Sequence, residues 1–130
     1  MGKEVAVDGC HLVISSGGSG PEPTITSQPS DQIFVSGKGV FFKEIKFKVS
    51  GVTAGDIANA DGKGEGTIMG TGDSILSIVG GTQDKVVLKD DESVEIDVNG
   101  TKPSQSGPVS ASGKIKVKVA STGQTDVIAL

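Results

Sequence analysis

Hydrophobic and polar residues alternate in several short stretches of this 130-residue chain. In residues 44–50, Ile45, Phe47 and Val49 occupy every second position between polar residues. A period of two puts such residues on one face of an extended strand, so this stretch predicts a strand with one buried and one solvated face. Residues 94–98 and 115–119 alternate in the same way, whereas no segment of ten residues has helical periodicity. The pattern therefore predicts an all-β fold with essentially no helix.

Two copies of one hydrophobic frame begin at Thr24-Ile25 and Thr67-Ile68, with an offset of 43 residues (67 − 24). Glycine, serine, aspartate and proline separate the anchor positions, so each copy predicts a short strand, a turn, a second short strand and a tight glycine turn. The later anchors are Ile33, Val35 and Gly37 in the first copy and Leu76, Ile78 and Gly80 in the second.

Turn residues divide the chain, taken as a single domain of residues 1–130, into three parts. Asp8-Gly9 stands between two hydrophobic runs and predicts an N-terminal hairpin over residues 1–15 with a type I′ turn. Residues 16–23 contain only Gly, Ser, Pro and Glu and predict a flexible connection. The main β body then occupies residues 24–130.

Within that body, residues 33–42 predict a second hairpin, and residues 51–66 and 101–113 predict polar loops. The outward residues of 94–98 are acidic and those of 115–119 are lysines, so these two strands are expected to pair antiparallel. We therefore expect a small Gly-rich domain of about ten short antiparallel strands, built as a sandwich, a barrel or a β-cone.

Composition argues against several classes of partner. The chain has 12 basic residues, all of them lysine, and a net charge of −4. Because arginine supplies the planar fork that grips phosphate, its absence argues against nucleic-acid binding. We find neither a charged-then-apolar leader nor a run of 18 apolar residues, so the sequence predicts no signal peptide and no membrane-spanning segment.

Candidate chemistry is sparse. Cys10 and His11 are the only cysteine and histidine, and adjacent residues of a strand point to opposite faces, so they cannot act together as nucleophile and base. We expect no enzyme and no cofactor of the single chain. Two readings stay open for this pair: a buried thiol beside a surface imidazole, or a metal ion shared with other chains near a symmetry axis. Calcium binding by Asp56, Asp61 and Glu65 lacks the ligand spacing of a known calcium loop.

Three of the four phenylalanines, Phe34, Phe41 and Phe42, fall in the second predicted hairpin. Phe41 and Phe42 are adjacent and must face opposite sides of their strand. Either both faces are buried, or one of these rings is presented to a partner. The three residues are therefore the candidate partner-docking surface.

Residues 33–40 (IFVSGKGV), preceded by residues 26–30 (TSQPS), resemble one repeat of the PAAR-like proteins, and residues 67–81 resemble a further copy. In that family a small β-structured cone caps the trimeric spike of a phage tail or contractile injection system. The chain departs from the family at residues 39–42, where Gly-Val-Phe-Phe stands in place of Pro-Ala-Ala-Arg. The family's metal site uses several histidines and a cysteine, and this chain offers only Cys10 and His11, so that site is not carried over.

The resemblance implies a non-enzymatic structural protein that caps a trimeric spike and contacts the target envelope. Such a tip would be part of the phage particle or injection machine and would be assembled in the bacterial cytoplasm. Two alternatives remain open: a capsid decoration or cement protein, and a carbohydrate-binding, adhesin-like module.

Overall fold

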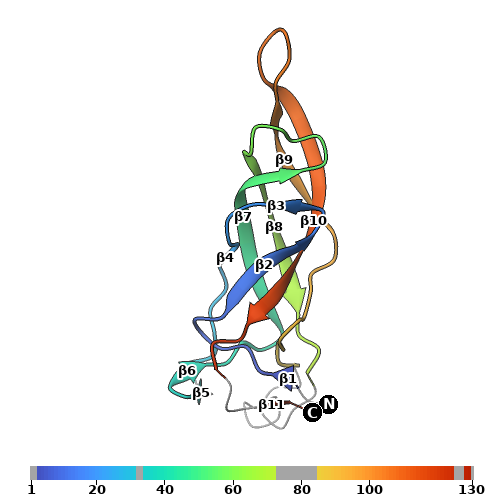
Figure 1. Ribbon diagram of the computed structural model, residues 1–130. Helices are drawn as coiled ribbons and strands as arrows, with labels where there is room; N and C mark the ends of the chain where they lie inside the picture. Colours follow the sequence, from blue (N-terminus) through green and yellow to red (C-terminus); the bar gives the residue numbers. More distant parts are fainter. Residues whose placement is uncertain (1–2, 32–33, 73–84, 125–127, 130) are drawn as a thin grey trace.

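The computed structural model describes residues 3–31, 34–72, 85–124 and 128–129 of the chain, and all of its regular elements are strands (Figure 1). The all-β prediction is confirmed. The strands are β1 (Lys3–Glu4), β2 (His11–Ser16), β3 (Gly18–Ser19), β4 (Thr24–Ile25), β5 (Phe34–Val35), β6 (Lys38–Gly39), β7 (Glu44–Ala54), β8 (Gly62–Met69), β9 (Ile96–Lys102), β10 (Val109–Ser121) and β11 (Ile128–Ala129).

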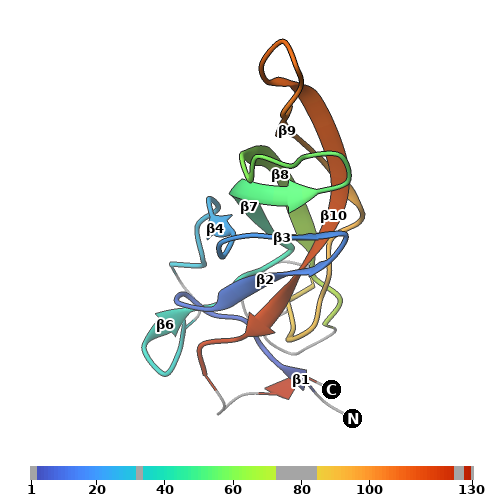
Figure 2. The same cartoon turned by 45° about the horizontal axis from the view of Figure 1, so that its top comes forward.

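One antiparallel sheet curls into a nearly closed barrel (Figures 1 and 2). Its strand order is β2-β10-β9-β8-β7-β3, and β4 pairs with β7 beside β3. Two short ribbons, β1 with β11 and β5 with β6, lie below the barrel. Closure leaves few free strand edges, which limits pairing with other chains.

The molecule tapers from a broad end to a narrow one (Figure 1). The two ribbons and both termini lie at the broad end, which we call the base. The connection between β9 and β10, residues 103–108, forms the narrow opposite end, which we call the tip.

Strand β7 is the centre of the core. Ile45, Phe47 and Val49 point inward and are at most 4% exposed, while the lysines between them are exposed, as the alternation predicted. The Thr-Ile anchors of the repeated frame lie on both sides of β7: Ile25 pairs with Phe47, and Ile68 pairs with Ile45. The later anchors of the second copy lie outside the described residues.

Residues 51–66 are not the loop that we predicted. β7 continues to Ala54, and β8 begins at Gly62, so only residues 55–61 connect them. Three of the four inward positions of β8 are Gly62, Gly64 and Gly66, where an added Cβ would lie 2.9 Å or less from atoms of the neighbouring strands and loop; the fourth is Ile68. The alternation of a strand is present, but glycine replaces the hydrophobic residues that would have revealed it.

β9 and β10 are antiparallel neighbours, as their charges predicted, but their register differs. Asp97 pairs with Lys114, with 3.5 Å between Oδ1 and Nζ, and Lys118 lies 3.9 Å from Asp90. The predicted loop at residues 101–113 is wrong, because both strands extend to Lys102 and Val109 and only residues 103–108 turn.

The predicted N-terminal hairpin over residues 1–15 is also wrong. Asp8-Gly9 does form a turn, closed by the Cys10 amide donating to the Val7 carbonyl at 3.0 Å, but only Gly9 has a positive φ. A type I′ turn needs positive φ at both central residues, so the turn at Asp8-Gly9 is of another type. The described segments on its two sides do not pair with each other. The flanking strands take partners from the C-terminal part instead: β1 pairs with β11 and β2 with β10.

A second hairpin does form, as β5–β6 with Phe34 opposite Gly39, but its second strand is Lys38–Gly39, which was predicted as part of the turn, and not residues 40–42. Its turn consists of Ser36 and Gly37, whose φ values are 53° and 78°. Positive φ at both positions is the signature of a type I′ turn. The hairpin is shorter than predicted, because the chain after Gly39 leaves the ribbon and crosses below the barrel, where Val40 bridges to Val7.

Candidate functional site

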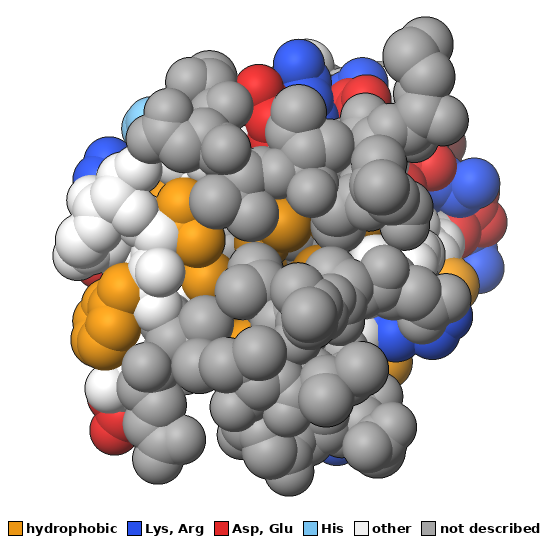
Figure 3. Space-filling view, turned by 90° about the horizontal axis from the view of Figure 1, so that it is seen from below, with side chains coloured by type: hydrophobic (Ala, Val, Ile, Leu, Met, Phe, Trp, Pro, Cys, Tyr) orange, Lys and Arg blue, Asp and Glu red, His pale blue; other side chains and the backbone are white. Residues whose placement is uncertain are grey.

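Two of the five large exposed hydrophobic side chains among the described residues, Phe34 and Met69, lie toward the base, whereas Val13, Val94 and Val109 lie along the barrel and beside the tip. Phe34 in β5 is 56% exposed, and Met69, at the basal end of β8, is 53% exposed. Val94, two residues before β9, is 77% exposed. A view of the base shows hydrophobic side chains at its surface (Figure 3). Exposed hydrophobic groups that cluster at one end of a molecule are typical of a surface for protein contact.

The structure separates the three phenylalanines proposed for docking. Phe41 is 2% exposed and belongs to the barrel core, so it is not available to a partner, and this part of the prediction is corrected. Phe42 faces the other way and packs, partly buried, against a second hydrophobic cluster at the base that contains Val40 and Val86. Only Phe34 presents most of its ring to solvent.

Cys10 and His11 point in opposite directions, as their adjacency required. The Cys10 thiol is buried in the barrel core, and this burial raises its pKa from 9.0 to about 12. His11 is exposed, and its Nδ1 lies 2.8 Å from Oε1 of Glu22. This contact joins β2 to the segment before β4, where the barrel sheet is not closed by hydrogen bonds.

Within the described ranges, no group of three or more His, Cys, Asp and Glu side chains is placed to hold a metal ion. A metal shared between chains at Cys10 or His11 stays a prediction. Because the Cys10 thiol is protonated at neutral pH and faces the core, the exposed imidazole of His11 is the part of this pair that a second chain can reach.

Asp61 and Asp91 each accept hydrogen bonds from the amide and the hydroxyl of one threonine. No sequence pattern predicted either interaction. Asp61 accepts hydrogen bonds from the amide and hydroxyl of Thr101, which hold its pKa below the ordinary value of 3.8. Asp91 is buried and accepts from the amide and hydroxyl of Thr71 and from the amide of Leu88, at 2.5 to 3.2 Å. Both oxygens of each carboxylate are therefore used to join segments distant in sequence, which weakens the calcium interpretation of Asp61.

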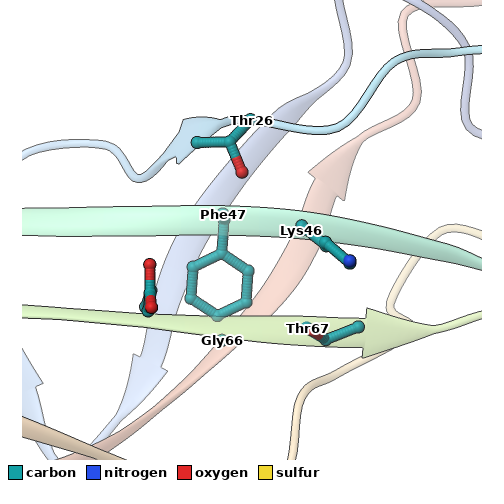
Figure 4. A pocket seen from close by; sticks show the side chains of 6 residues that line it. Thr26, Lys46, Phe47, Gly66 and Thr67 are labelled. Carbon is teal, nitrogen blue, oxygen red and sulfur yellow. The ribbon is translucent and has the colours of Figure 1, made fainter.

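A groove lined by both polar and apolar side chains, Phe47 and Val49 among the latter, runs over the outer face of β4, β7 and β8. It consists of two adjoining hollows of about 380 and 660 Å³ that share Glu65. Figure 4 shows the first hollow, in which the Phe47 ring lies against β8 at Gly66, with Lys46 and Thr67 beside it on neighbouring strands. The polar side chains that line the groove are hydroxyl-bearing or charged: Thr24, Thr26, Lys46, Lys48, Ser50, Lys63, Glu65 and Thr67.

Comparison of the chain with protein families, with curated proteins and with solved structures found no match. None of the described residues belongs to a helix long and apolar enough to cross a membrane. The site must therefore be interpreted from its own geometry.

Proposed function

We propose that this protein is a non-enzymatic structural component of a phage tail or contractile injection system, the PAAR-like tip that caps the trimeric spike and contacts the target envelope. The observation that carries the proposal is the polarity of the tapered molecule. The exposed side chains of Phe34 and Met69 lie toward the base, whereas the tip, residues 103–108, contains only Pro, Ser, Gln and Gly. An apolar base fits a subunit contact and a polar tip fits an aqueous front surface.

The barrel also fits a mechanical role. Its longest strands, β7 and β10, span 11 and 13 residues and have antiparallel neighbours on both sides; β10 runs along the long axis, and the end of β7 turns across it. Hydrogen bonds along these strands tie each segment to its neighbours, which resists deformation of the cone. By covering the strand edges of the spike beneath it, the base would prevent end-to-end association of spikes.

A structural role is further supported by the placement of the most reactive side chains. The thiol of Cys10 is held in its unreactive protonated form, and His11 projects from the opposite side of the strand toward Glu22. General base and nucleophile must lie within hydrogen-bonding distance to act together, and these two do not.

Co-purification with the trimeric spike tests the proposal, and we expect one copy of this chain for every three spike chains. Phe34→Asp should abolish the association, because it places a charge in the apolar contact, without unfolding a residue that is 56% exposed. Val109→Asp is the matched control, since Val109 is 37% exposed but lies beside the tip. Recovery of hundreds of copies per particle would instead identify a capsid decoration protein, and a monomer that never associates with the spike would refute the proposal.

A further inference from the structure

The groove over β4, β7 and β8 carries positive charge on a protein that is negatively charged overall. Three of its lining residues are lysines, and Glu65 is its single acidic one, whereas the whole chain has 16 acidic and 12 basic residues. Nζ of Lys46 lies 3.5 Å from Oε2 of Glu44, a residue that does not line the groove. Across the part of the chain that the structure describes, Lys48 and Lys63 form no salt bridge, although Lys63 lies close enough to Asp61 to lower the pKa of that carboxyl.

Strand geometry spaces these lysines regularly. Lys46 and Lys48 are two residues apart on the outer face of β7, which separates them by about 6.6 Å along the strand. Lys48 is opposite Glu65 in the register of β7 and β8, so Lys63 is its diagonal neighbour, at about 7–8 Å. From Lys46 to Ser50 the groove extends about 13 Å. It is long enough for several linked units of a chain, and hydroxyl groups lie beside its cations, since Thr24 is opposite Lys48 and Thr67 is opposite Lys46.

Glu65 decides which polyanion fits. A phosphodiester backbone offers only acceptors, so a carboxylate among the lysines would repel it without any compensating hydrogen bond. A sugar chain carries acidic groups for the lysines and also hydroxyl donors for Glu65. The threonine and serine hydroxyls that line the groove can donate to or accept from the remaining sugar hydroxyls.

We infer that the groove of β4, β7 and β8 binds an acidic oligosaccharide, with Lys46, Lys48 and Lys63 contacting its anionic groups and Glu65 accepting from its hydroxyls. The chain has no Trp or Tyr on which a sugar ring could stack, and binding through charge and hydrogen bonds does not need such stacking. The inference is independent of the docking role of the base, because the groove lies on the side of the barrel.

Isothermal titration of the full chain with three tetramers tests the inference: tetragalacturonate, a sulfated tetrasaccharide and the neutral maltotetraose. We expect at least one of the acidic sugars to bind, with an affinity that falls as salt is raised, and maltotetraose to bind at least about tenfold more weakly. Lys48→Gln combined with Lys63→Gln should abolish binding. The control pair Lys89→Gln and Lys102→Gln removes the same charge from exposed residues outside the groove and should bind like the wild type.

Glu65→Ala separates a sugar site from a nonspecific cationic surface. Loss of a hydrogen bond to a carboxylate should weaken sugar binding about tenfold, although the substitution makes the groove more positive. A tetrathymidylate should not bind the wild type. The inference is overturned if neither acidic sugar binds, if the control pair loses binding as the groove pair does, or if Glu65→Ala tightens binding of every polyanion, the oligonucleotide included.

Discussion

Replacing Gly64 by alanine would place a methyl group inside the contact between β8 and β9. A Cβ at this position would lie 2.6 Å from the backbone oxygen of Asp97 and 2.9 Å from Cγ1 of Val98. A backbone oxygen cannot rotate away as the end of a side chain can, so the two strands must move apart. We therefore expect Gly64→Ala to destabilise the barrel although it shortens no side chain and removes no charge.

The size of the effect follows from two opposing terms. Overpacking in a well-packed interior costs about 1–3 kcal/mol. Alanine also lowers the conformational entropy of the unfolded chain, which stabilises the folded protein by about 0.4–1 kcal/mol. The free energy of unfolding should thus fall by about 1–2 kcal/mol. Since the entropy of unfolding is about 0.27 kcal/mol/K for 130 residues, the midpoint of thermal unfolding should fall by about 4–7 °C.

Urea titration followed by circular dichroism, together with calorimetry, measures both quantities. Glu65→Ala is the matched control, because Glu65 is the next residue of β8, already carries a Cβ and points outward; its effect should stay within about 0.5 kcal/mol. If Gly64→Ala proves as stable as the wild type, β8 does not approach β9 as closely as described, and the structural reason for its glycines is lost.

Two further predictions concern pH. Burial raises the pKa of Cys10 from 9.0 to about 12, so the contribution of this thiol to stability is fully present below about pH 9 and is lost as pH rises toward about 12. Urea unfolding at about pH 8 and about pH 10 should therefore show an alkaline loss of stability in the wild type that Cys10→Ala lacks. Equal losses in both proteins would disprove this prediction. The hydrogen bonds from Thr101 lower the pKa of Asp61, so its contribution is present above the ordinary value of 3.8 and is lost as pH falls through the folded value. Asp61→Asn should therefore lose less stability at acid pH than the wild type when the free energy of unfolding is measured against pH. An unchanged loss would show that the hydrogen bonds between Asp61 and Thr101 do not contribute to stability.

The sequence was most informative where side chains alternate visibly. The first part of β7, the antiparallel pairing of β9 with β10, and a hairpin turn that begins at Ser36 were predicted, because hydrophobic periodicity, opposite charges and turn residues are local signals. The first part of β8, residues 62–66, was missed because its inward positions are glycines, whose role appears only when the close neighbouring strands are known. Sequence patterns cannot reveal a requirement that arises from backbone approach.

Long-range pairing was equally invisible. Asp8-Gly9 predicted a hairpin because its flanking runs are close in sequence, but the strands of these runs, β1 and β2, find partners 100 residues or more away. The candidate sites also depend on contacts between segments that are distant in sequence. The exposure of Phe34 and the burial of Phe41 follow from how the chain crosses the base, and the groove exists only because β4 returns beside β7. Each depends on three-dimensional neighbours that no local signal specifies.

The pairing of β2 with β10 bears on how the protein folds during its synthesis. Ile14 pairs with Val117, which is 103 residues later in the chain. At a translation rate of about 5–20 residues per second, the ribosome makes the partner strand about 5–20 s after β2 has been made. The β7–β8 hairpin needs no such delay, because its strands are separated by only residues 55–61. β2 therefore waits unpaired on the nascent chain until β10 has been made, and the barrel can close only after that.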